Sequence, residues 1–157
     1  MFRRSLLIAA CALQIVGCVN TVQQATLGGI DYPYGPSSLH LHSLSRLELS
    51  PESLPSAAFV FVQFDDIDRQ TTRATGVLEV AIVLPDRTKI EQSINLNNLG
   101  TNDENWDRTV RMYRIDFEFV PPLAEVPESG LPVSVTWTPV DGKASTVRGV
   151  LRGPHRP

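Results

Sequence analysis

His40 and His42 are the residues whose type and spacing come closest to a metal-binding pattern. In a β-strand the side chains of residues i and i+2 point to the same face, roughly 7 Å apart, so this pair could begin a metal site. The same spacing is that of an edge strand whose polar face carries both histidines while Leu39 and Leu41 face a core. We favour the second interpretation, because the next carboxylate, Glu48, lies beyond an interruption of the alternation.

Asp65, Asp66 and Asp68 are a second candidate for metal binding, because carboxylate oxygens suit Ca²⁺. That ion takes about six to eight oxygen ligands, so the cluster would need Asp103 or Glu104 from elsewhere in the chain. The glycine and the late glutamate of an EF-hand loop do not follow. A solvated turn, in which aspartate bonds to the nearby backbone, explains the cluster more simply. We therefore predict no metal and no other cofactor.

The sequence holds no pattern typical of an enzyme or of a nucleic-acid-binding protein. It lacks a Gly-x-Ser-x-Gly motif and a glycine-rich phosphate loop. Its 14 Lys and Arg residues stand against 17 Asp and Glu residues, which leaves no basic footprint for nucleic acid. Hydrophobic residues make up 42% of the chain, as in ordinary globular proteins. We expect a non-catalytic globular protein.

Three aromatic residues are candidates for contact with a partner: Tyr32, Tyr34 and Trp106. The two tyrosines lie in a Tyr-Pro-Tyr-Gly-Pro stretch, which forms either a turn packed on the domain or a small recognition patch. Trp106 precedes the clearest strand pattern, and it either closes the end of a core or marks an exposed contact. Packing is the commoner fate of such large rings.

The N-terminus has the pattern of a secretory signal. Arg3 and Arg4 precede an apolar segment of 13 residues, Ser5 to Gly17. A membrane-spanning helix needs about 20 apolar residues, so this segment is too short for one. The chain has only two cysteines, Cys11 and Cys18, so cleavage after Gly17 leaves a single cysteine and no disulfide.

The residues Ile15-Val16-Gly17-Cys18 resemble the lipobox of bacterial lipoproteins. The resemblance implies that signal peptidase II cuts before Cys18, whose thiol and amino group then carry acyl chains such as palmitate and bind the membrane. Ile8-Ala9-Ala10-Cys11 is a competing match, but its apolar segment is shorter than usual. In this family a residue other than aspartate after the cysteine, here Val19, favours the outer membrane over the inner one.

The chain is therefore expected to have four parts. Residues 1–17 are a signal peptide, 18–38 the lipidated cysteine and a flexible tether, 39–152 one β-sandwich domain, and 153–157 a polar tail. The tether is rich in Gly, Pro, Ser, Thr and Gln, and about 20 flexible residues reach roughly 25 Å. That length would hold a domain just off a bilayer.

From Leu39 onward the hydrophobic period is two, which is typical of strands, and no helix of normal length is indicated. We predict about seven strands, the first of them interrupted near Ser43. They cover residues 39–49, 57–64, 75–84, 90–96, 113–119, 131–138 and 146–151. Turns separate them regularly, which favours an all-β, antiparallel two-sheet sandwich. Immunoglobulin-like, fibronectin-like and transthyretin-like sandwiches resemble this pattern, and alternation leaves the topology open.

These observations predict a lipid-anchored cell-envelope protein that binds or scaffolds another envelope component, either a protein or a glycan. Long irregular loops usually carry such contacts, so Asn97–Asp107 and Pro121–Gly130 are the candidates. Two alternatives stay open. One is a lipoprotein subunit of a secretion or assembly machine. The other is a metal-dependent binder or enzyme that uses the histidine pair or the aspartate turn.

Overall fold

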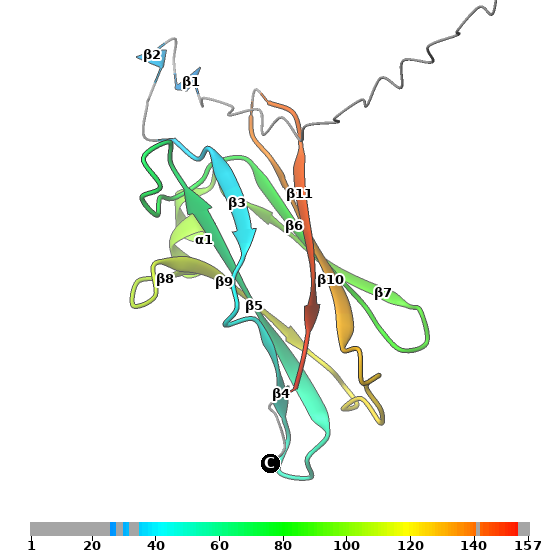
Figure 1. Ribbon diagram of the computed structural model, residues 1–157. Helices are drawn as coiled ribbons and strands as arrows, with labels where there is room; N and C mark the ends of the chain where they lie inside the picture. Colours follow the sequence, from blue (N-terminus) through cyan, green and yellow to red (C-terminus); the bar gives the residue numbers. More distant parts are fainter. Residues whose placement is uncertain (1–25, 28–29, 32–34, 141, 154–157) are drawn as a thin grey trace, which may run out of the picture.

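Two antiparallel sheets packed face to face form the domain, as the alternating sequence predicted (Figure 1). The computed structural model describes residues 26–27, 30–31, 35–140 and 142–153. One sheet holds β3 (Ser38–Leu41), β4 (Arg46–Leu49), β5 (Pro55–Asp65), β8 (Trp106–Asp107) and β9 (Met112–Glu118). The other holds β6 (Val77–Val83), β7 (Lys89–Asn95), β10 (Leu131–Thr138) and β11 (Ser145–Leu151).

The strand order identifies the topology of the sandwich. It is β3-β5-β9-β8 in the first sheet, with β4 also on β5, and β11-β10-β6-β7 in the second. Every pairing in these two sheets is antiparallel, and the chain crosses from one sheet to the other after β5, β7 and β9. A separate small pair, β1 (Thr26–Leu27) and β2 (Ile30–Asp31), lies in the segment expected to be a tether.

The core lies between the sheets because the strands alternate between apolar and polar residues. On β9, Tyr113, Ile115 and Phe117 are buried, whereas the polar residues between them are exposed. The inner face of the central strand β5 is buried. Its outer face is covered by arginine side chains: Arg114 lies 4.4 Å from the centre of the Phe59 ring.

The two main sheets contain nine strands in place of the seven predicted. The first predicted strand is two strands, β3 and β4, which pair with successive parts of β5. Between them Ser45 replaces the missing ladder bond, because its hydroxyl oxygen accepts from the N–H of Phe61 at 2.9 Å. The other additional strand, β8, has 2 residues, too few to show any period.

The segment 97–107, predicted to be a polar loop, contains the helix α1 (Leu99–Glu104) as well as β8. Asn98 caps this helix, since its side chain accepts from the N–H of Thr101 at 3.1 Å. The helix has 6 residues, less than two turns, so the sequence carries no readable helical period there.

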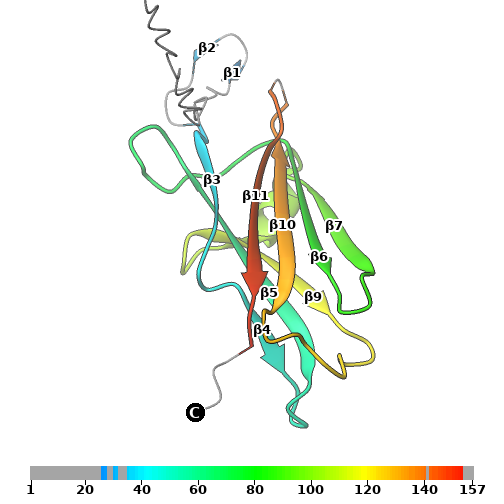
Figure 2. The same cartoon turned by 45° about the vertical axis from the view of Figure 1, so that its right-hand side comes forward.

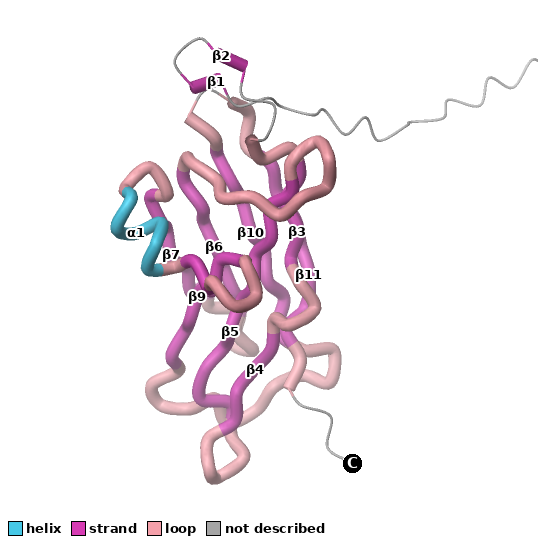
Figure 3. Tube along the Cα trace, turned by 90° about the vertical axis from the view of Figure 1, so that its left-hand side faces the viewer, coloured by secondary structure: helices cyan, strands magenta, loops and turns pink. Residues whose placement is uncertain are grey.

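The sandwich has two ends, which carry different connections (Figures 2 and 3). At the proximal end the chain leads into β3, where Ser38 pairs with Asp65. This end comprises the connections 66–76, 96–111 and that between β10 and β11. The opposite, distal end comprises the connections 50–54, 84–88 and 119–130. The two loops predicted to carry contacts therefore lie at opposite ends.

Candidate functional site

His40 and His42 lie at one edge of the first sheet, and each ring is engaged locally. His40 lies on β3, with its Nε2 3.1 Å from Ser38 Oγ and 3.5 Å from Asp65 Oδ2. His42 follows β3, and its Nδ1 accepts from the N–H of Leu44 at 3.2 Å. The two histidines therefore have separate partners, and only His40 lies on the edge strand itself.

Ser38, His40 and Asp65 bring together the residue types of a catalytic triad without its geometry. In a triad the carboxylate binds one ring nitrogen and the hydroxyl binds the other, so that the imidazole can take the proton while the acid orients it. Here the serine and aspartate oxygens both approach Nε2. The side chain of His40 is also 54% exposed, so water competes for both contacts. This arrangement cannot act as a triad.

The three aspartates of the β5–β6 turn do not converge on one point. Asp66 is buried, and its Oδ1 accepts from the N–H groups of Asp68 at 2.9 Å and Gln70 at 2.8 Å. Asp65 accepts from the side chain of Gln63 instead, at 2.8 Å. Within the described residues, no group of three or more His, Cys, Asp or Glu side chains is arranged to hold a metal ion. The turn is shaped by these bonds to the backbone.

Trp106 packs against the core at the proximal end. Its ring is partly buried and meets Tyr113 edge to face, with ring centres 5.1 Å apart. The guanidinium group of Arg73 lies 5.1 Å from the centre of the Trp106 ring. Trp106 therefore covers one side of the core, and Arg73 covers part of the Trp106 ring that remains exposed.

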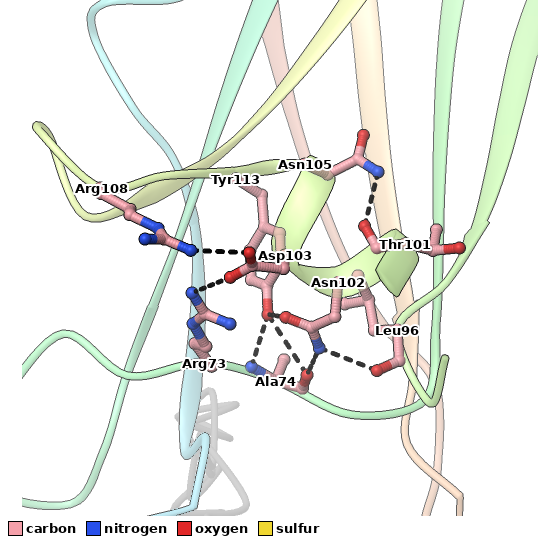
Figure 4. Close-up of polar contacts among 9 residues, drawn as sticks. All are labelled: Arg73, Ala74, Leu96, Thr101, Asn102, Asp103, Asn105, Arg108 and Tyr113. Atoms are coloured by element: carbon pink, nitrogen blue, oxygen red, sulfur yellow. Dashed lines mark hydrogen bonds and ion pairs between the residues drawn. The ribbon is translucent and has the colours of Figure 1, made fainter. Parts of the chain in front are cut away.

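A buried polar network fixes α1 to the sandwich (Figure 4). The Tyr113 hydroxyl donates to Asn102 Oδ1 at 2.9 Å and accepts from the N–H of Ala74 at 3.0 Å. The Asn102 amide donates to the carbonyl oxygens of Ala74 and Leu96, both at 2.8 Å. Burial raises the pKa of Tyr113, although its bonds with Ala74 and Asn102 act in the opposite direction. Sequence reasoning missed this network, because nothing in the polar run marks Asn102 as the member that is buried.

Asp103 joins two arginines at the surface above this network. It lies 2.9 Å from Arg73 and 2.7 Å from Arg108. The hydrogen bonds from Arg73 and then Arg108 lower the pKa of Asp103. Because all three side chains are largely exposed, the ion pairs contribute little to stability. Their effect is positional, since they align the β5–β6 connection, α1 and the loop after β8.

The distal loop 119–130 combines an exposed apolar tip with a fixed backbone. Val120 is 89% exposed, and Pro121 and Pro122 beside it are exposed too. Behind this tip, Leu123 and Val126 pack on the core, and the N–H of Leu123 donates to Pro55 O at 2.8 Å. The loop is therefore irregular without being loosely attached.

The charges at the distal end are mainly negative. The connections 50–54, 84–88 and 119–130 carry Glu52, Asp86, Glu125 and Glu128 against a single cation, Arg87. These residues are all exposed. A surface of this kind favours a basic partner electrostatically.

The outer face of the second sheet has a shallow hollow of about 290 Å³ above Ala81. Glu79, Lys89 and Glu91 line its sides. Lys89 Nζ lies 2.6 Å from Glu91 Oε2, and this hydrogen bond and the charge of Glu91 raise the pKa of Lys89. The hollow has a polar lining with an internal ion pair, and it lacks the apolar walls of most ligand pockets.

Several predicted features lie outside the described residues: the signal segment 1–17, Cys18, Tyr32 and Tyr34. In the part of the chain that is described, no helix is long and apolar enough to cross a membrane. No family model matches the chain, and no curated protein and no solved structure matches it either.

Proposed function

We propose that this chain is a lipid-anchored protein of the bacterial cell envelope, and that its sandwich is a non-catalytic binding module for another envelope component. The lipobox-like residues ending at Cys18 support the anchor. Val19 after the cysteine favours the outer membrane. Among the two predicted contact loops, the distal loop 119–130 is the one we assign to partner binding.

The observation that carries this assignment is the position of the loop relative to the point where the chain leads into the sandwich. Ser38 lies at the proximal end, and loop 119–130 lies at the distal end. A lipid attached on the N-terminal side of Ser38 would therefore leave the distal loop pointing away from the bilayer. Its tip, Val120, is exposed on a fixed backbone, so binding would cost little ordering entropy.

The partner fitted by this surface is a protein with a basic rim around an apolar pocket. Val120 and the two prolines would enter the pocket, and Glu52, Glu125 and Glu128 would face the rim. A glycan partner is less well matched, because the tip offers aliphatic groups instead of hydrogen-bonding side chains.

The anchor is tested by the mass of the N-terminal peptide after expression of the full chain in a bacterium. We expect a peptide that begins at Cys18 and carries acyl chains. Cys18→Ala should abolish the modification, whereas the matched change Cys11→Ala should leave it intact. Loss of acylation in Cys11→Ala alone would place the anchor at Cys11. An unmodified wild-type chain would refute the proposed lipid anchor.

Partner binding is tested by co-purification with a C-terminally tagged chain from detergent-solubilised membranes. We expect a stoichiometric partner that is lost with Val120→Asp and retained with Leu44→Asp, a matched change at a residue that is 40% exposed in a turn. Deleting residues 121–130 would be a poorer test, because it also removes Leu123 and Val126 from the core. Equal capture of the partner by both variants would show that the distal loop does not bind it.

A further inference from the structure

We infer that the proximal end of the sandwich docks on the bilayer surface to which the chain is anchored. This inference rests on the proposed lipid anchor. It means that the domain is held in a defined orientation on the bilayer and does not move freely at the end of its tether. The docking groups are three exposed aliphatic side chains, Ile67, Leu99 and Val140, together with two cations beside them, Arg69 and Lys143.

The three aliphatic residues stand at separate connections of the same end. Ile67 lies in the β5–β6 turn and is 53% exposed, Leu99 opens α1 and is 85% exposed, and Val140 follows β10 and is 66% exposed. A single exposed aliphatic residue needs no explanation. All three connections of the proximal end carry one such residue. Toward the distal end Val83 and Val150 are exposed on the strands β6 and β11, and Val120 is the exposed large aliphatic residue in a connection among the described residues.

These groups suit the interface of a bilayer. Aliphatic tips can enter the boundary between headgroups and acyl chains, and cations next to them can meet the phosphates. Arg69 lies two residues after Ile67, and Lys143 lies three residues after Val140, and both are exposed. Asp68 lies between Ile67 and Arg69 in the sequence and offsets the charge of Arg69. Docking should therefore depend on apolar insertion and be insensitive to salt.

Two of the tips are held in position by the domain. In the β5–β6 turn the N–H of Asp66 donates to Gln70 O at 2.9 Å, and Asp66 Oδ1 accepts two further backbone N–H groups. Leu99 directly follows the cap Asn98 and belongs to the helix that Asn102 fixes to the sandwich. Docking therefore needs little ordering of these tips, which makes small apolar contacts effective.

The predicted tether allows this contact. The chain between Cys18 and Ser38 has about 20 residues, with a reach of roughly 25 Å when flexible. The proximal end can therefore touch the bilayer without this segment being stretched.

The test uses the full lipoprotein reconstituted into vesicles of phosphatidylcholine that contain a lipid-borne fluorescence quencher. An acylated Cys18 leaves the mature chain without a free thiol, so one introduced cysteine can carry a fluorophore. We expect labels on Ile67→Cys and Val140→Cys to be quenched several-fold more than a label on Val120→Cys, with no change in high salt. Equal quenching at the two ends, or quenching that salt abolishes, would overturn the inference.

A second variant separates apolar insertion from mere proximity to the anchor. With the label on Val140→Cys, the changes Ile67→Ser and Leu99→Ser should reduce the quenching, and the matched change Leu44→Ser should not. Unchanged quenching would show that the tips do not insert. The mass of the N-terminal peptide is measured on the same samples: an unacylated chain refutes the anchor and the docking together, whereas an acylated chain without end-specific quenching refutes only the docking.

Discussion

The hydroxyl of Tyr113 and Oδ1 of Asn102 share a buried hydrogen bond of 2.9 Å that fixes a short helix to the sandwich. Asn102 is one of only two buried polar or charged residues among those described, the other being Asp66. Asp66 Oδ1 accepts from two backbone N–H groups, and the Asn102 amide bonds to backbone carbonyls and to Tyr113. The connections of the proximal end are therefore shaped by buried polar groups as well as by apolar packing.

Replacing Tyr113 by phenylalanine should lower the free energy of unfolding by about 1–3 kcal/mol, because Ala74 N–H and Asn102 Oδ1 lose their partner without gaining access to water. Urea denaturation measures this change. Thr146→Val is the control, since it removes only an exposed hydroxyl pair with Thr136. A loss no larger than that of the control would mean that the network contributes nothing.

The raised pKa of Tyr113 predicts a pH dependence on the alkaline side. The stability that the protonated phenol contributes is fully present below its ordinary pKa of about 10, and it is lost as the pH rises through the higher folded-state pKa. The difference in unfolding free energy between wild type and Tyr113→Phe should therefore be constant at neutral pH and shrink above about pH 10. A difference that stays constant across this window would contradict the burial of the hydroxyl.

Asp103 predicts a smaller effect on the acid side. Its pKa is lowered by Arg73 and Arg108, so its contribution is present above the ordinary pKa of about 4 and is lost as the pH falls through the lower folded-state value. Asp103→Asn should flatten the acid limb of the stability profile slightly, because the group is exposed. An acid limb as steep in Asp103→Asn as in wild type would contradict this coupling to the two arginines.

Gly76 should not tolerate a side chain. Its φ is +106°, and a Cβ there would lie 2.3 Å from Thr138 O, a backbone atom that cannot move aside. Gly76→Ala should cost at least about 2 kcal/mol and lower the melting temperature accordingly. Gly153→Ala provides the comparison, because nothing lies within 4 Å of its Cβ position. Equal melting temperatures for the two variants would refute the steric argument.

The sequence predicted the strands well because one face of each is buried and the other is solvated. The predicted span of β10 agrees with the observed one at both ends, and the interruption after Leu41 was recognised from the slip in alternation. The two-residue β8 and the six-residue α1 were missed, since neither is long enough to show a period. The order of the strands also needed the structure, because alternation assigns faces without assigning neighbours.

Site prediction was limited by the same physics. The aspartate turn was foreseen as a turn, because aspartate favours such positions locally. The pairing of Asn102 with Tyr113 and of Asp103 with Arg73 depends on which loops meet, and loop contacts follow no sequence period. The exposure of Val120 was equally unreadable, since its neighbours Phe119 and Leu123 are apolar residues that pack inward.

The interrupted first strand has a mechanical consequence. β3 and β4 lie along one side of β5, and the N–H of Leu47 on β4 also donates to Arg152 O, just after β11, at 3.0 Å. If the domain is pulled from its N-terminal side while a partner holds the distal end, the force runs along these strands. Their bonds to β5 would then be sheared together instead of being unzipped one at a time, so β3 and β4 would be the elements that resist such a pull.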